Sequence, residues 1–375
     1  MKKKVLLISV NRSDFGIQKN LIKELIRAKK IEFKLLVTGT HLSKYFGHTV
    51  NEITNEKINS FDKIKLSNID YKNQNIINLF SSSIKKFYKY YKTYKPDLVI
   101  ILGDRYEMLS AAIPLVLLNI PIAHIHGGEK TEGSFDDIFR NMITNCADLH
   151  FVCHDTYKKR VSNIKGENKN IFNFGSLSLE DFNKIKFKTK TDIQKKFNIF
   201  FGRKSILVTY HPETKYKGKN QTDIDILLKA INQFNDINFI FTIPSPDPGN
   251  KNIINKIENY CRLNNNCYYV KSLGKLYYFS TLNIVDAVLG NSSSGILEVP
   301  SFKKTTINIG NRQLGRLQAN SIINCKLNSS EIAKAIRKVY SYKQKKKLIK
   351  TKNIFYKKNT TSNFLKGINN FLEKI

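Results

Sequence analysis

Short apolar runs alternate with polar, glycine-containing loops along the first half of the chain. Unbroken apolar runs of this length are typical of strands that are buried on both faces of a parallel sheet. Helical periodicity in the segments between them, clearest over residues 76–94, predicts helices that cover the sheet. The predicted strands are residues 5–10, 32–38, 98–102, 150–153 and 171–174.

A second series of the same kind follows a segment, residues 182–204, that shows no clear core pattern. The fold class that this pattern predicts is α/β, with two doubly wound Rossmann-like domains facing a cleft. We expect an N-terminal domain over residues 1–180, a C-terminal domain over 200–350, and a last helix over 351–375 that packs back on the N-terminal domain. The predicted strands of the second series are residues 205–210, 238–243, 285–289 and 305–309.

Residues 122–140, IAHIHGGEKTEGSFDDIFR, concentrate histidines, glycines, carboxylates and an arginine where a strand leads into a helix. The i,i+2 spacing of His124 and His126 places both imidazoles on one face of a strand. Ser134 and Asp137 fit a capping box, which predicts that a helix begins there. Such a junction is where α/β proteins bind ligands, and the two histidines are compatible with a metal pair as well as with hydrogen-bonded structural residues.

The loop of residues 290–295, GNSSSG, is small, rich in hydroxyl groups and bounded by glycines. If it opens a helix, its backbone N–H groups and the helix dipole favour an anion such as phosphate, and Glu298 can accept hydrogen bonds from ribose hydroxyls. A serine-rich cap on a core helix is the alternative. No Walker lysine and no G-x-G-x-x-G occur at this loop, which argues against P-loop and NAD-binding proteins.

Four cationic or hydrogen-bonding side chains each come just after a predicted strand. Arg12, Arg105, His211 and Arg312 are groups that can clamp a diphosphate. The loops of both halves therefore carry groups suited to a nucleotide.

The chain is strongly basic, with a formal net charge of +33 and a pI near 9.8. Its lysines are spread over the whole sequence, and no zinc-finger spacing, RNP-like aromatic pattern or basic tail accompanies them, so we do not expect a nucleic-acid partner. The five cysteines include no C-x-x-C pair, which fits a reduced, cytoplasmic setting. No apolar run approaches the roughly 18–20 residues of a membrane span, and we expect a soluble protein.

Six motifs together resemble the hydrolysing UDP-N-acetylglucosamine 2-epimerases of sialic acid synthesis. They resemble equally the relatives that act on UDP-2,4-diacetamido-2,4,6-trideoxyhexose in legionaminic acid synthesis. The resemblance runs from about residue 3 to 325 and implies a GT-B-like pair of domains, a homodimer or homotetramer, and a reaction without metal or nicotinamide cofactor. The motifs, in chain order, are NRSD, GDRYE, HIHGGEKTEG with DDIFR, HPET, GNSSSGILEVPS and NIGNRQLGR.

The reaction that this resemblance implies is loss of UDP as a base removes the C2 proton, followed by addition of water with inversion at C2. The resemblance places much of the catalytic wall in residues 1–180 and UDP binding in 200–350. The catalytic candidates that it carries over are Asp104, His126, Glu129, Asp136, Arg140, which would orient a carboxylate, and His211. The UDP-binding candidates are Arg12, Gly16, Arg105, His211, Leu273, Ser292, Ser293, Glu298 and Arg312.

One position departs from part of the family. Non-hydrolysing relatives and the animal bifunctional enzyme have a glutamate where this chain has His126, so either His126 or Glu129 is the candidate for that glutamate's role. The residues around C4 and C6 of the sugar carry no recognisable motif, and only the segment of residues 131–133 hints at the diacetamido substrate. A GT-B glycosyltransferase using a UDP-sugar, a non-catalytic sugar-nucleotide sensor and a basic nucleic-acid-binding protein are the alternatives.

Overall fold

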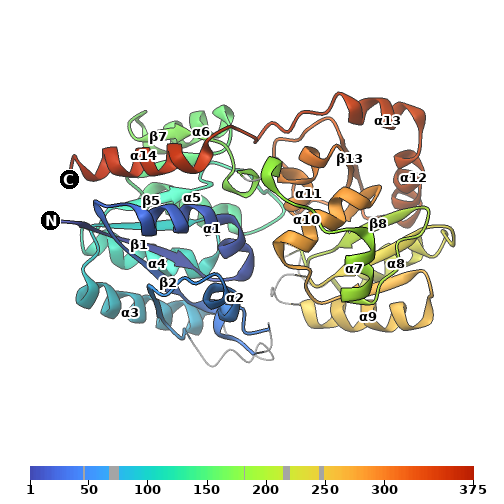
Figure 1. The fold of residues 1–375 in the computed structure, drawn as a ribbon, viewed down its shortest axis with the longest axis horizontal. Coiled ribbons are helices and arrows are strands. Elements are labelled where there is room, and N and C mark those ends of the chain that lie inside the picture. The colour runs from blue at the N-terminus through green and yellow to red at the C-terminus, as the bar shows by residue number, and fades with distance from the viewer. Residues whose placement is uncertain (45–46, 67–75, 181, 214–219, 245–248) are drawn as a thin grey trace. The chain divides into compact units, whose positions relative to one another are not determined.

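The computed structural model describes residues 1–44, 47–66, 76–180, 182–213, 220–244 and 249–375. These residues form two compact units (Figure 1). Unit 1 consists of Met1–Glu129, Asp136–Glu180 and Phe355–Ile375, and unit 2 of Lys130–Phe135 and Asp181–Ile354. Among the described helices, none is long and apolar enough to cross a membrane.

Unit 1 is built on a parallel sheet of seven strands in the order β3-β2-β1-β4-β5-β6-β7. Six of them follow the Rossmann order, with the switch point between β1 and β4. The strands are β1 (Lys3–Ser9), β2 (Ile31–Val37), β3 (Phe61–Lys63), β4 (Leu98–Leu102), β5 (Ile122–Ile125), β6 (Leu149–Val152) and β7 (Ile171–Asn173). The helices are α1 (Arg12–Arg27), α2 (Val50–Asn55), α3 (Ile76–Tyr94), α4 (Tyr106–Leu117), α5 (Asp136–Cys146), α6 (Asp155–Lys165) and α14 (Thr360–Leu372), with 3₁₀ turns η1 (Gly39–Leu42) and η2 (Leu177–Leu179).

Strand β1 explains why unit 1 has two apolar layers. Val5 and Leu7 point into the cluster that contains residues of α1 and α14, whereas Leu6 and Ile8 point into the cluster that contains residues of α3 and α4. Alternate side chains of a strand lie on opposite faces, and a strand covered on both faces must be apolar throughout. The apolar run that predicts β1 therefore reflects its position in the middle of the sheet, where both faces are covered.

The C-terminal helix α14 completes one of these layers. The ring of Phe364 stacks on that of Phe151 in β6, with centroids 4.4 Å apart. A Cβ at Gly367 would lie 2.9 Å from the Phe151 ring, so a glycine is needed for this approach. The end of the chain thus packs on unit 1, after the whole of unit 2 has been traversed.

Unit 2 repeats the plan with a parallel sheet in the order β10-β9-β8-β11-β12-β13, which is again the Rossmann order. The strands are β8 (Ser205–Thr209), β9 (Asn238–Thr242), β10 (Cys267–Val270), β11 (Ala287–Gly290), β12 (Thr305–Ile309) and β13 (Ile322–Cys325). The helices are α7 (Lys190–Phe197), α8 (Asn220–Ile231), α9 (Asn250–Leu263), α10 (Gly274–Ile284), α11 (Ser294–Leu297), α12 (Ser329–Val339) and α13 (Tyr342–Ile349), with 3₁₀ turns η3 (Phe182–Lys184) and η4 (Val299–Phe302). The predicted α/β class with two doubly wound sheets is confirmed.

Several details differ from the sequence-based expectation. Helix α7 lies within residues 182–204, where no core pattern was recognised, and it carries a complete capping box of Thr189 and Asp192. Strands β10 and β13 were missed because both are short and only partly buried. Helix α11, expected to support an anion site by its dipole, has only four residues, so that dipole contribution is small.

Candidate active site

The switch point of unit 1 brings together the loops that follow β1 and β4. Arg12 is the first residue of α1, and the side chain of Asn11 caps the helix by accepting from the Asp14 backbone N–H at 3.0 Å. After β4, the guanidinium of Arg105 donates through Nε and Nη2 to the carboxylate of Glu107, at 3.1 and 3.2 Å. Arg105 is therefore held in a fixed direction by a buried acid.

Asp14 is a group at this switch point that the sequence analysis did not single out. Burial raises the pKa of its carboxyl to about 7, while nearby Arg105 and the Val10 N–H act in the opposite direction. The NRSD motif contains the residue, but nothing in the motif distinguishes a titrating acid from a helix-capping one.

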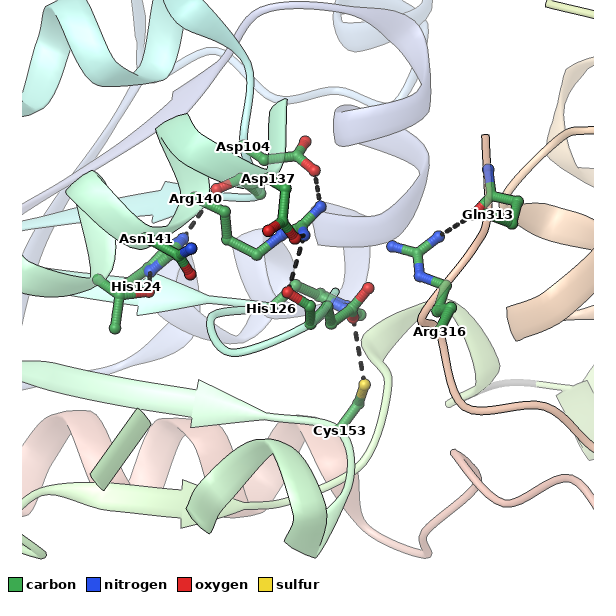
Figure 2. A network of polar contacts seen from close by, with 12 residues as sticks. Asp104, His124, His126, Asp137, Arg140, Asn141, Cys153, Gln313 and Arg316 are labelled. Carbon is green, nitrogen blue, oxygen red and sulfur yellow. Dashed lines mark hydrogen bonds and ion pairs between the residues drawn. The ribbon is translucent and has the colours of Figure 1, made fainter. Parts of the chain in front are cut away.

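Arg140 is the centre of the polar network in unit 1 (Figure 2). It projects from α5, is 1% exposed, and donates through Nη2 to the Asp104 carboxylate. Its Nη1 donates to Asp137 Oδ1 at 3.3 Å and to the backbone carbonyl of Glu129 at 2.9 Å. One guanidinium thus fixes Asp104 and the loop that carries Glu129, which is the geometry expected of an arginine that orients a carboxylate.

The other carboxylates of α5 lie in its first turn. Asp136 is the first residue of the helix, and Asp137 also accepts from Arg160 Nη2 at 3.4 Å. Carboxylates are favoured at a helix N-terminus by the partial positive charge there. The helix begins at Asp136, close to the start that the Ser134–Asp137 pattern predicts, and Asp137 contacts two arginines.

His124 and His126 do not act as a pair. His124 Nε2 lies 2.8 Å from the Gly103 carbonyl and Nδ1 lies 3.2 Å from Thr144 Oγ1. Burial lowers the pKa of His124 to about 4, so the neutral ring donates from Nε2 to Gly103 and accepts at Nδ1 from the hydroxyl. Both nitrogens are occupied, and His124 supports the loop of Asp104.

His126 lies beyond the end of β5, in the left-handed region with φ of 66°. The prediction that it shares a strand face with His124 is wrong for this reason. Its Nδ1 is 2.5 Å from Glu129 Oε1, and Cys153 Sγ donates to the same oxygen at 3.3 Å. All three side chains are buried, and a non-glycine residue held at positive φ is typical of functional sites.

The side chains of His126, Glu129 and Cys153 form a group whose ligand atoms all lie within 4.8 Å of one another, which is compatible in composition with a metal site. Within the structure the three side chains are joined by hydrogen bonds, because His126 Nδ1 and Cys153 Sγ both lie within hydrogen-bonding distance of Glu129 Oε1.

In unit 2, His211 follows β8 and the serine loop follows β11, again at the switch point. The His211 backbone N–H donates to Asn291 Oδ1 at 2.7 Å, and Asn291 Nδ2 donates to the His211 carbonyl at 2.9 Å. Ser292 and Ser293 come next and lead into α11. The amide of Asn291 thus connects the two loops.

Glu298 closes α11 and is held by a short chain of hydroxyl groups. Ser294 Oγ donates to Glu298 Oε2, and Tyr278 Oη lies 2.6 Å from the same Ser294 oxygen. Burial, and next the charge of Glu298, raise the pKa of Tyr278 far above its usual value, so its hydroxyl stays protonated. Leu273, another UDP-binding candidate, is buried at the N-cap of α10, the helix that carries Tyr278.

Arg312 belongs to the loop after β12. Its Nη1 donates to the Asn291 carbonyl at 3.2 Å, and its backbone N–H donates to Glu213 Oε1 at 3.3 Å. Gly310 has φ of 70°, and a Cβ there would lie 2.5 Å from Glu213 Oε1. Gly16, by contrast, lies within α1 and has no atom near the position of a Cβ.

The candidates therefore fall into two sets, one in each unit. Unit 1 joins Asp104, Arg140, Glu129 and His126 in one network and brings Arg12 and Arg105 to its switch point. Unit 2 joins His211 and Arg312 through Asn291. Five residues of these sets are not predicted from the sequence, namely Asp14, Cys153, Glu213, Tyr278 and Asn291. Asp14, Glu213 and Asn291 lie inside the recognised motifs, and that position is the one signal that could have pointed to them.

Comparison with known proteins shows which sequences this chain is similar to. A family model described as UDP-N-acetylglucosamine 2-epimerase matches residues 23–369. The chain is 37% identical over 334 residues to the GDP/UDP-N,N'-diacetylbacillosamine 2-epimerase (hydrolyzing) of Campylobacter jejuni, covering 88% of this chain and 86% of that protein. It is 32% identical over 372 residues to the polysialic acid biosynthesis protein P7 of Escherichia coli, covering 99% and 95%.

A solved structure shares the fold. The UDP-GlcNAc 2-epimerase of Neisseria meningitidis, in a crystal structure bound to UDP-GlcNAc, superposes with a TM-score of 0.84 at 18% identity. The match covers 98% of this chain and 100% of that one. At 18% identity, this similarity shows that the two proteins share a fold.

Proposed function

The chain belongs to the UDP-N-acetylglucosamine 2-epimerase family, and from this premise we propose that it is a hydrolysing UDP-sugar 2-epimerase. The resemblance drawn from the sequence motifs is confirmed by the family model over residues 23–369. The proposed substrate is UDP-N-acetylglucosamine or its 2,4-diacetamido-2,4,6-trideoxy analogue. The proposed product is the free manno-configured sugar, for the synthesis of nonulosonic acids of the sialic or legionaminic type.

The observation that carries this proposal is the network around Arg140. Elimination of UDP needs a base at C2 and an acid near the glycosidic oxygen, each held in a defined direction. Arg140 orients the Asp104 carboxylate and the Glu129 backbone through one buried guanidinium. Unit 1 thus offers several proton-handling groups with fixed positions, which supports a role in acid–base chemistry.

We assign the proton-handling role to His126 and the orienting role to Glu129. The carboxylate of Glu129 is 1% exposed and takes hydrogen bonds from both His126 Nδ1 and Cys153 Sγ on one oxygen. A carboxylate bound at Nδ1 fixes the ring and leaves Nε2 as the nitrogen that faces away and can exchange a proton. The arrangement resembles the carboxylate–imidazole pairs of other acid–base enzymes in this respect.

Unit 2 supplies the proposed contacts to UDP. Departure of a diphosphate requires positive or hydrogen-bonding groups near its oxygens. Arg312 and His211 offer these from adjacent loops, with Ser292 and Ser293 beside them. Glu298, fixed by Ser294, is the proposed acceptor for ribose hydroxyls.

A glycosyltransferase shares the general fold and is the alternative within enzymes. The name of the 37% identical relative, a hydrolysing 2-epimerase, favours the epimerase. A transferase needs an acceptor, whereas a hydrolysing epimerase releases UDP from the sugar nucleotide and water alone.

The test is incubation of the purified chain with each of the two UDP-sugars and no acceptor. We expect stoichiometric UDP and a free 2-acetamido sugar from at least one of them, and the faster substrate identifies the pathway. Asp104→Asn should lose at least roughly 100-fold in turnover, the usual contribution of an acid–base group. Absence of UDP from both substrates, or unchanged turnover in Asp104→Asn, contradicts the proposal.

We further propose a cytoplasmic homodimer. None of the five cysteines, all of which lie in the described part of the chain, forms a disulfide, in keeping with a reducing compartment. Large apolar side chains are exposed at the end of α4 and on α5, namely Val116, Leu117, Ile138 and Met142, and exposed apolar groups of this size favour self-association. Light scattering should give a dimer mass that falls to the monomer in Ile138→Lys/Met142→Lys.

A further inference from the structure

Three loops of unit 2 are joined in a closed ring of hydrogen bonds. The peptide of His211 is bound by the side chain of Asn291, and the carbonyl of Asn291 accepts from Arg312 Nη1. The backbone N–H of Arg312 donates in turn to Glu213, two residues after His211. Each loop is thus bound to the other two.

The Asn291 side chain contributes two bonds of opposite sense to this ring. Oδ1 accepts from the His211 N–H at 2.7 Å and Nδ2 donates to the His211 carbonyl at 2.9 Å. Asn291 is fully buried, so water does not replace either bond. Only a short amide carries a donor and an acceptor in this arrangement; an ionised aspartate has two acceptors and would place a carboxylate oxygen against the His211 carbonyl.

The main-chain carbonyl of Asn291 contributes the next two bonds. It accepts from Arg312 Nη1 at 3.2 Å and from Gln313 Nε2 at 2.9 Å, which uses both of its lone pairs. One edge of the Arg312 guanidinium is therefore committed to the ring. This fixes the direction of the side chain.

Glu213 closes the ring with a single oxygen. Its Oε1 accepts from the N–H groups of Asn311 and Arg312 at 3.1 and 3.3 Å. The carboxylate is buried, and Gly310 leaves the room that it occupies, as a Cβ there would be 2.5 Å away. Glu213 acts here as an acceptor, a role that a glutamine carbonyl can also fill.

We propose that Asn291 and Glu213 are positioning residues that hold His211 and Arg312 in a fixed relation. A phosphate bound by Arg312 then lies at a constant distance from His211. The inference rests on the proposed function in one respect, namely that His211 and Arg312 act on the UDP-sugar. Neither positioning residue needs to touch the substrate. Their effect is on turnover through the two groups that do.

The first test compares Asn291→Asp with Asn266→Asp. Asn266 is a matched control because its Nδ2 donates to the carbonyls of Phe234 and Ile237, both at 2.9 Å, at the opposite end of the same sheet. We expect Asn291→Asp to lower kcat by about 10–100-fold with KM changed by less than about threefold. Asn266→Asp should leave kcat near wild type.

The second test keeps the inference falsifiable if Asn291→Asp folds poorly. Glu213→Ala should lower kcat by about tenfold, and Glu213→Gln should restore most of that loss because the acceptor is retained. Equal kcat in Asn291→Asp and Asn266→Asp, or equal loss in Glu213→Ala and Glu213→Gln, overturns the inference. A wild-type chain that releases no UDP from either sugar is a separate result, which contradicts the proposed function instead.

Discussion

His126 directs Nδ1 at the carboxylate of Glu129 across 2.5 Å while its backbone is held in the left-handed region. If His126 exchanges the proton and Glu129 orients it, His126→Gly should lose at least roughly 100-fold in turnover. Glycine suits the positive φ, so the backbone should be undisturbed. Added imidazole should fill the vacated space and restore part of the activity.

Glu129→Gly provides the matching variant. Under the same assignment its turnover falls and imidazole does not restore it, because the imidazole of His126 is still present and has lost only its orientation. Rescue of Glu129→Gly by formate, together with no response of His126→Gly to imidazole, would show that Glu129 is the proton-handling group.

Arg140→Lys tests the central ion-pair network. A lysine lacks the planar fork of donors by which Arg140 contacts Asp104, Asp137 and the Glu129 carbonyl from two separate nitrogens. Because Arg140 is 1% exposed and its partners Asp104 and Asp137 are half-buried, we expect loss of these bonds to cost about 3 kcal/mol of stability in addition to lost turnover.

Arg160→Lys is the control for that substitution. Arg160 contacts the same Glu129 carbonyl and Asp137, but its side chain is 26% exposed, so we expect a loss below about 1 kcal/mol. Chemical denaturation of both variants measures the difference. Equal losses would mean that burial of Arg140 does not set its contribution.

Tyr278→Phe removes the hydroxyl that lies 2.6 Å from Ser294 Oγ. Ser294 then holds Glu298 less firmly, and we expect the Kd for UDP to rise by about 3–10-fold, equivalent to one hydrogen bond of about 0.5–1.5 kcal/mol. Tyr277→Phe is the control, because the Tyr277 ring packs against Phe197 and Lys196. Calorimetric titration with UDP should give a higher Kd for Tyr278→Phe than for Tyr277→Phe. Equal Kd values would show that the Tyr278 hydroxyl does not support Glu298 in UDP binding.

Three buried histidines make stability depend on pH. Burial lowers the pKa of His41 to about 3, of His124 to about 4 and of His150 to about 3. The histidines of the unfolded chain bind protons near pH 6.5, whereas those of the folded chain do so only at pH 3–4. The contribution of the three neutral histidines to the free energy of unfolding is therefore complete above about pH 6.5. It is lost as the pH falls towards 4, by about 1.4 kcal/mol per pH unit for each histidine.

His150→Leu isolates one of these groups. The buried ring nitrogens of His150 have at most a weak contact with the Ala147 backbone in the described part of the chain, so an apolar side chain should stabilise the fold by about 1–3 kcal/mol. The variant should also take up one proton fewer on unfolding between pH 6 and 4, so that its free energy of unfolding depends less steeply on pH. Denaturation curves at pH 5 and 7.5 measure both effects; a slope equal to that of the wild type would contradict the assignment.

The sequence predicts the parts of this structure that depend on local pattern. Strand β12 has the predicted bounds of Thr305–Ile309, because an apolar run between polar loops is itself the signature of a central parallel strand. The strands of low burial escape that signature. The loops with glycines and charges follow the carboxyl ends of the strands as expected, and the carboxyl ends of parallel strands meet at one edge of the sheet.

What could not be predicted depends on contacts between distant segments. The i,i+2 spacing cannot reveal that His126 leaves the strand at positive φ and binds Glu129. Asn291 reads as one polar residue of a serine-rich loop, and its role requires knowledge that His211, 80 positions away, lies against it. Local propensity also leaves open whether Asp137 caps its helix or binds arginines.

The measurement that tests the central claim most directly is the reaction of the wild-type chain with a UDP-2-acetamido sugar in deuterated water, followed by NMR of the released monosaccharide. The account predicts one deuterium at C2 and inverted configuration there, because the C2 proton is removed during loss of UDP and replaced from solvent. A released sugar with its original hydrogen and configuration at C2 would show simple hydrolysis and contradict the account.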